Sequence, residues 1–148
     1  RKELIAKYNL SLAEISAIKN GSNLTTADGQ VIPNSELTYF SSEPRSYAYC
    51  SDTMYSEKLI GMIKDVDLLY HEATFASSDE KLAKQTGHST SAQAATIALK
   101  SGARRLLIGH FSSRYKSIEP LLKDAKAIFE NSIAVEDGQV FEIPVVRR

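Results

Sequence analysis

From Pro44 onward, apolar and polar residues follow one another in blocks that predict strands and helices in turn. Short apolar runs bounded by polar residues predict strands, and longer stretches with apolar residues three or four positions apart predict helices. The expected elements are strands over residues 45–53, 66–75 and 104–111, helices over residues 56–65, 90–102 and 117–131, and a terminal hairpin over residues 133–144. Three strand–helix alternations favour an α/β fold with right-handed crossovers and a mostly parallel sheet.

Two turn signals support these bounds. Thr90, with Gln93 three residues later, is a capping box that opens a helix, and Gly102 is typical of a helix end. Asp137-Gly138 is a hairpin turn signal within the last predicted element.

The chain before Pro44 has a weaker pattern. Leu12, Ile15 and Ile18 form one short amphipathic stretch that Asn20-Gly21 ends, and further turn residues follow. We therefore expect residues 1–35 to be irregular and weakly ordered, and residues 36–148 to form the packed domain.

Composition places limits on partners and compartment. The 148 residues suit one globular domain, and 18 basic residues balance 18 acidic ones, so no overall field indicates a nucleic-acid or membrane partner. A local patch could still bind such a partner. Cys50 is the only cysteine, which excludes an intrachain disulfide, and no long apolar run or signal peptide is evident. These features predict a soluble, cytoplasmic chain, and its start without methionine suggests a piece of a longer protein.

Titratable residues follow each of the three predicted strands. They lie in the segments Ser51-Asp52-Thr53, His71-Glu72-Ala73-Thr74, and His110-Phe111-Ser112-Ser113-Arg114, each of which also carries hydroxyl side chains. Because ligands in open α/β sheets gather beyond the carboxyl ends of the strands, we expect these residues to meet at one edge of the sheet.

Asp52 and His110 are candidate metal ligands. A carboxylate at a buried strand end is costly unless it is paired, caps a helix or binds a metal, and Asp52 could simply cap the helix over residues 56–65. Aspartate oxygen and histidine nitrogen suit zinc, and manganese or iron with less preference. A zinc site requires at least three protein ligands, so these two residues alone do not complete one.

Glu72 and His88 are expected to pair. Adjacent strand residues face opposite ways, so His71 and Glu72 cannot easily point at the same site. His88 lies in a glycine-flanked loop, where Glu72 could hold its imidazole and favour the protonated form, as in a general acid. A hydrogen bond that only fixes the loop is an equally good interpretation.

Arg114 and its neighbours are candidate substrate ligands. An arginine beside Ser112, just after a strand, suits a clamp for phosphate or carboxylate, although surface arginines are usually only solvated. Thr90 begins a helix whose first amides could receive an anion.

Several segments together resemble the C-terminal half of the ribonuclease Z family, tRNA 3′-processing endonucleases of the metallo-β-lactamase superfamily. They are "YCSDT", "DLLYHEATF", "TGHSTSAQAATIALKSGARRLLIGHFSSRY" and "AVEDGQVFEIP". The resemblance implies an αββα sandwich, of which this chain holds the C-terminal βα half. It also implies a zinc-dependent endoribonuclease in which metal-activated hydroxide cleaves precursor tRNA on the 3′ side of the acceptor stem.

The resemblance assigns roles to individual residues. Asp52 would bridge two zinc ions and His110 would bind one of them, while Glu72 and His88 would supply the proton to the leaving 3′-oxygen. Arg114 would meet the scissile phosphate. Residues 1–35 would be the returning part of an arm that grips tRNA across a homodimer, although the Gly-Pro pattern expected there is not evident.

The chain departs from the family in one large respect. The His-x-His-x-Asp-His motif, which carries most metal ligands, does not occur in this sequence. We therefore expect the isolated chain to bind zinc weakly and to be inactive. The alternatives are another hydrolase of the same fold, such as an arylsulfatase-like enzyme or a phosphodiesterase, and a non-catalytic α/β module.

Overall fold

The protein is described by a computed structural model that covers residues 1–39 and 44–145. It divides into two compact units, which meet in the sequence between Glu43 and Pro44. Among the described residues, no helix has the length and apolar composition needed to cross a membrane.

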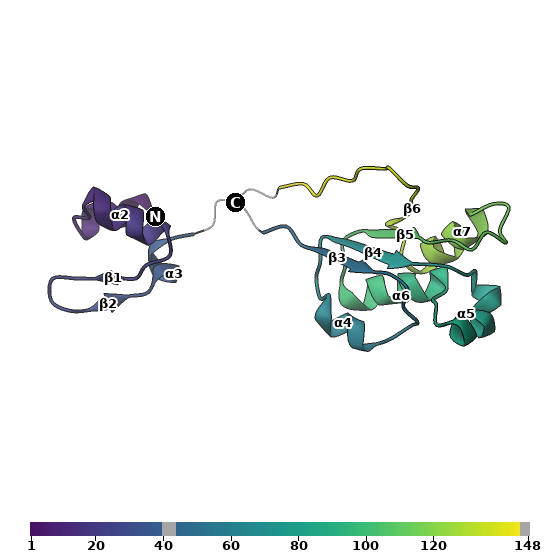
Figure 1. The fold of residues 1–148 in the computed structure, drawn as a ribbon. Coiled ribbons are helices and arrows are strands. Elements are labelled where there is room, and N and C mark those ends of the chain that lie inside the picture. Colours follow the sequence, from purple (N-terminus) through teal and green to yellow (C-terminus); the bar gives the residue numbers. More distant parts are fainter. Residues whose placement is uncertain (40–43, 146–148) are drawn as a thin grey trace. The chain divides into compact units, whose positions relative to one another are not determined.

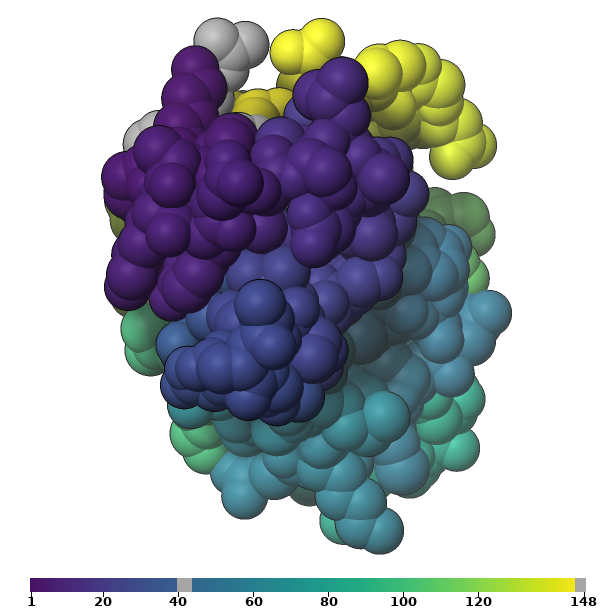
Figure 2. Space-filling model, turned by 90° about the vertical axis from the view of Figure 1, so that its left-hand side faces the viewer, coloured from purple at the N-terminus to yellow at the C-terminus, as the bar shows by residue number. Residues whose placement is uncertain are grey.

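The N-terminal unit contains three short helices and a two-stranded hairpin. These are α1 (Lys2–Lys7), α2 (Leu12–Lys19), β1 (Leu24–Thr25), β2 (Val31–Ile32) and α3 (Asn34–Leu37). Figure 2 shows the helices α1 and α2 in purple and the hairpin in dark blue. Helix α2 confirms a helix at the predicted stretch, but of its expected apolar face only Ile18 is buried and Leu12 is exposed; a capping box between Ser11 and Glu14 opens the helix.

A small apolar core holds this unit together. Its buried members are Ile18, Leu24, Ile32 and Leu37. The turn at residues 28–29 lets β1 and β2 pair antiparallel, so that Leu24 lies opposite Ile32 and both side chains reach this core. The segment expected to be irregular therefore has regular structure, while its assignment to a substrate-binding arm stays a prediction.

The C-terminal unit is built on a four-stranded parallel sheet. Its strands are β3 (Tyr47–Cys50), β4 (Leu68–Glu72), β5 (Leu106–Gly109) and β6 (Ser132–Ala134), in the order β3-β4-β5-β6 (Figure 1). All neighbouring strands are parallel, which confirms the predicted sheet and the α/β class.

Helices connect the strands. They are α4 (Lys58–Met62), α5 (Glu80–Thr86), α6 (Ser91–Ser101) and α7 (Glu119–Ile128). The predicted start of α6 is confirmed, because the Thr90 hydroxyl accepts a hydrogen bond from the Gln93 amide, and Gly102 ends the helix with φ +73°. The sequence pattern missed α5, a short helix whose one buried residue is Ala83.

The predicted terminal hairpin is wrong. Residues 133–134 do belong to a strand, but β6 pairs parallel with β5 and the chain turns at Asp137-Gly138 without returning as a strand. The Val135 amide donates to the Ile108 carbonyl, and the following segment then passes over one face of the sheet. Strand β5 offers β6 the buried neighbours Leu107 and Ile108, whereas Val140, which follows the turn, is exposed.

The two faces of the sheet differ in what covers them. Helices α4, α6 and α7 pack against one face, around a core that includes Cys50, Leu69, Leu106 and Ile108 (Figure 1). The opposite face, together with residues 135–143, lines a cavity of about 600 Å³. Tyr49 and Tyr70 stack on this second face with ring centroids 4.6 Å apart. Parallel sheets are usually covered on both faces, so this face is unusually open.

Gly109 allows Tyr70 to lie flat on the open face. A Cβ atom at position 109 would lie 2.7 Å from the Tyr70 hydroxyl oxygen. Gly109→Ala should therefore lower the free energy of unfolding by about 1–3 kcal/mol, measured by urea denaturation, because the ring must shift.

Gly61→Ala is the matched control, since a Cβ there meets nothing within 4 Å. It should leave stability unchanged or raise it by up to about 1 kcal/mol, because alanine favours a helix over glycine. Equal effects of the two substitutions would contradict the assigned role of Gly109.

Candidate functional site

The candidate site lies at the carboxyl ends of β3, β4 and β5. Asp52 follows β3 and His110 follows β5 directly, and both have left-handed backbone, with φ +48° and +61°. This conformation is uncommon for residues other than glycine and persists where the surrounding structure enforces it. The backbone thus turns sharply after β3 and after β5, at the two residues that were expected to bind a metal.

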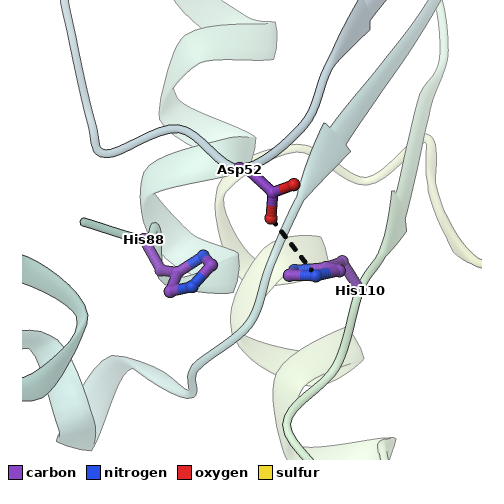
Figure 3. A group of neighbouring side chains, drawn as sticks. All are labelled: Asp52, His88 and His110. Carbon is purple, nitrogen blue, oxygen red and sulfur yellow. Dashed lines mark ion pairs between the residues drawn. The ribbon is translucent and has the colours of Figure 1, made fainter. Parts of the chain in front are cut away.

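Asp52 and His110 meet as predicted. Asp52 Oδ1 lies 3.3 Å from His110 Nε2, and both side chains are at least partly exposed (Figure 3). The alternative role of Asp52 as a helix cap is excluded, since the residue at the N-cap of α4 is Glu57.

Glu72 and His88 also meet as predicted. His88 Nδ1 lies 2.8 Å from Glu72 Oε1, and Glu72 is fully buried. The carboxylate accepts four further hydrogen bonds, from the amides of Thr53, Thr74 and Ser89 and from the Thr74 hydroxyl. Burial by itself disfavours the charged form, but these hydrogen bonds outweigh it and lower the pKa of Glu72.

Thr74 links the two pairs, and sequence reasoning missed it. Its hydroxyl donates its one proton to Glu72 Oε2 at 2.6 Å. The Thr74 hydroxyl oxygen can therefore only accept a hydrogen bond from His110 Nδ1, which lies 2.9 Å away. His110 therefore carries a proton on Nδ1, and Glu72 places one on Nδ1 of His88 in the same way. The only signal in the sequence was the position of Thr74 two residues after Glu72, which puts both on the same side of the chain.

These hydrogen bonds leave the Nε2 atoms of both imidazoles as acceptors. His110 Nε2 then faces the Asp52 carboxylate, and two acceptors 3.3 Å apart require a positive charge between or beside them. Either a second proton on the imidazole or a metal ion supplies that charge. The arrangement therefore suits both metal binding and proton transfer.

His88 joins Asp52 and His110 in a group that could hold a metal ion. One ligand atom from each residue lies within 4.8 Å of the others (Figure 3). The sequence predicts that His88 pairs with Glu72, as a general acid or to fix its loop, but spacing along the chain does not show that the ring reaches this group. Two imidazole nitrogens and a carboxylate oxygen are suitable ligands for zinc.

Ligand atoms in a tetrahedral zinc site with bonds of about 2.1 Å lie about 3.4 Å apart. Asp52 Oδ1 and His110 Nε2, 3.3 Å apart, already have this spacing, and a ligand atom of His88 lies within 4.8 Å of the other two residues. The three residues therefore fit zinc in chemistry and number.

Arg114 is linked to this group through Phe75. Its guanidinium is 5.0 Å from the centre of the Phe75 ring, which makes an edge-type contact with the His88 ring, and its Nε donates to Ser112 Oγ at 3.2 Å. Thr90 is buried and its hydroxyl caps α6. The substrate contacts expected of Arg114, Ser112 and Thr90 stay predictions.

His71 points away from the site, as the alternation along β4 predicted. It is fully buried, and its Nδ1 is hydrogen-bonded to the Glu72 carbonyl at 2.7 Å. Its Nε2 has no hydrogen-bond partner within the described ranges. Burial lowers the pKa of His71, and the bond to the Glu72 carbonyl offsets this only in part.

Comparison with known proteins identifies related chains. The family model described as "Beta-lactamase superfamily domain" matches residues 19–111. Ribonuclease Z of Porphyromonas gingivalis W83 is 51% identical over 130 residues, which is 88% of this chain and 43% of that protein. Ribonuclease Z of Phocaeicola vulgatus is 46% identical over 147 residues, which is 99% of this chain and 48% of that protein. The chain thus spans less than half the length of these relatives.

A solved structure supports the fold. The metallo-beta-lactamase fold protein YhfI from Bacillus subtilis superposes with a TM-score of 0.59 and 29% identity, over 64% of this chain and 38% of that one. The expected metallo-β-lactamase-like fold, present in part, is confirmed.

The buried His71 predicts a pH dependence of stability. Its pKa in the folded state lies below its ordinary value, so the unfolded chain binds more protons between the two values. The stabilising effect of neutral His71 is complete above the ordinary pKa of about 6.5 and is lost as the pH falls below it. Urea unfolding of the wild type and of His71→Asn at several pH values measures this. The difference in stability between them should shrink from neutral to mildly acidic pH, and a constant difference would contradict the assignment.

Proposed function

Since the chain belongs to the beta-lactamase superfamily domain family and is homologous to ribonuclease Z, we propose that it supplies half of the active site of a zinc-dependent endoribonuclease. The substrate of this enzyme is precursor tRNA, which it cleaves on the 3′ side of the acceptor stem. The observation that carries the proposal is the Glu72–His88 pair, held directly beside Asp52 and His110.

His88 is the proton donor to the leaving 3′-oxygen. Glu72 accepts a hydrogen bond from Nδ1 and fixes the imidazole, so that Nε2 is the atom that transfers a proton into the space beside Asp52 and His110. When the P–O3′ bond breaks, the electron pair passes to the 3′-oxygen and this proton neutralises it.

Asp52 and His110 are the metal ligands that this chain supplies. Zinc bound there would activate water and neutralise charge on the phosphate. Thr74 keeps the proton of His110 on Nδ1, so that its Nε2 is free to bind a metal, and the left-handed backbone at Asp52 and His110 turns both side chains toward the same space.

Arg114 is the phosphate ligand. Its position over the Phe75 ring, next to His88, would let the guanidinium contact a phosphoryl group whose leaving oxygen is protonated by His88. Ser112 supports it through the hydrogen bond to Nε.

The isolated chain is inactive and holds zinc weakly under this proposal. Three ligand atoms do not complete a two-zinc site, and the His-x-His-x-Asp-His motif of the family is absent from the sequence. The role of residues 1–35 as part of a tRNA-binding arm, the homodimer of the intact enzyme and a cytoplasmic location belong to the same proposal. The open face of the sheet, lined by Tyr49 and Tyr70, is where the second sheet of an αββα sandwich would pack.

The proposed role of His88 can be tested in a full-length protein that contains this chain. His88→Ala should lower single-turnover cleavage of precursor tRNA by about 10²–10⁴-fold, the usual contribution of a general acid. A precursor with sulfur in place of the leaving 3′-oxygen should restore most of the rate, since a thiolate leaves without a proton.

Gln85→Ala, an exposed change on α5, is the control and should cleave both precursors normally. Unchanged cleavage of normal precursor tRNA by His88→Ala would defeat the ribonuclease Z assignment. An equal loss on both substrates would show that His88 acts as a metal ligand instead.

A further inference from the structure

A cavity of about 360 Å³ borders His88 and neither Asp52 nor His110. It is lined by Met54, Tyr55, Glu80, Lys84, His88 and Gln93. His88 is the one residue that this lining shares with the three-residue group, since neither Asp52 nor His110 borders the cavity. One imidazole thus belongs both to the group that could hold a metal ion and to a cavity with a mixed apolar and charged lining.

The volume and lining suit one nucleoside. Small-ligand pockets begin at about 300 Å³ and combine apolar walls with a few polar groups. Tyr55 and Met54 supply an aromatic ring and a polarisable thioether, which are surfaces on which a nucleobase packs. Lys84 and Glu80, one helical turn apart on α5, supply groups of opposite charge that can meet the donors and acceptors of a base edge.

The wall that carries Tyr55 is anchored to the candidate site. The Thr53 amide donates to Glu72 Oε1 at 2.9 Å, and the Ser89 hydroxyl donates to the Thr53 carbonyl at 2.6 Å. Tyr55 itself packs on the core of the sheet, and its hydroxyl donates to Glu57 at 3.1 Å. The ring is therefore held in place before any ligand arrives, which reduces the entropic cost of binding.

The opposite wall is fixed as well. Gln93 Oε1 accepts from the Thr90 amide at 3.0 Å, and Gln93 Nε2 donates to Glu80 Oε1 at 3.2 Å. This contact joins the start of α6 to the start of α5, so the polar side of the cavity has a defined shape. Lys84, which is exposed, remains available to a ligand.

In-line phosphoryl transfer indicates which nucleoside belongs here. The attacking and leaving oxygens lie on opposite sides of the phosphorus, and His88 is proposed to protonate the leaving 3′-oxygen. The nucleoside that keeps this oxygen must therefore lie next to His88, away from Asp52 and His110. We propose that the cavity binds this nucleoside, the last one of the tRNA product, with its base packed on Tyr55. The inference rests on the proposed function for the direction of the substrate.

Methionine-methyl NMR on the 148-residue chain tests the cavity directly. Met54 lines it, whereas the exposed Met62 lies on α4 outside its lining and serves as an internal control. Adenosine 5′-monophosphate, which carries a free 3′-hydroxyl, should shift the Met54 methyl signal in a saturable way at millimolar concentration and leave Met62 unchanged. Ribose 5-phosphate, which lacks a base, should shift neither signal.

Variants identify the contacts. Tyr55→Ala should weaken nucleotide binding about tenfold, in line with the loss of one base–aromatic stack, while Tyr55→Phe should retain it. Lys84→Ala should weaken nucleotide binding without altering the fold. Lys81→Ala, on the same helix, should leave nucleotide binding unchanged. Lys84 thus keeps the test decisive if Tyr55→Ala fails to fold.

Three results would overturn the inference. They are the absence of a Met54 shift, an equal shift with ribose 5-phosphate, and unchanged affinity in both Tyr55→Ala and Lys84→Ala. Failure of the proposed function is separate, since it shows as an absence of tRNA cleavage by the wild-type full-length protein whatever Met54 does. Cleavage without a Met54 response would defeat the cavity inference alone.

Discussion

The arrangement of the site depends on the buried carboxylate of Glu72. A charge without exposure to solvent is tolerated only when its oxygens are satisfied, and five hydrogen bonds from four residues do this. The same bonds bring together the segment after β3, the end of β4 and the loop before α6. One electrostatic requirement thereby fixes three separate segments and, through Thr74, the proton of His110 as well.

The sheet explains why these segments lie within reach of one another. Parallel strands deliver their carboxyl ends to one edge, and the left-handed backbone of Asp52 and His110 turns the chain there without glycine. The strain at both residues is offset by the packed unit behind them, where one side of α6 and almost all of β4 and β5 are buried. The Asp52, His88 and His110 group therefore rests on a rigid base, while the open tyrosine face on the other side of the sheet has room for a further layer.

Local patterns predicted the parts of the fold that local physics decides. Apolar runs gave β3, β4 and β5, and the Thr90–Gln93 capping box with Gly102 gave α6 to the residue. The parallel pairing of β6 with β5 was not predictable from the turn signal at Asp137-Gly138, because it is a long-range contact. Likewise, the pairing of Glu72 with His88 followed from charge and loop position, whereas the role of Thr74 and the approach of His88 to Asp52 depend on how three loops pack.

The central claim is that this chain holds an organised but incomplete metal site. Calorimetric titration of the 148-residue chain with zinc tests it most directly, with His110→Ala as the reference for binding elsewhere on the surface. The expected result is weak binding, with a dissociation constant well above the micromolar range, that His110→Ala weakens further, since three ligand atoms do not complete a two-zinc site. Stoichiometric binding at submicromolar zinc would contradict the account.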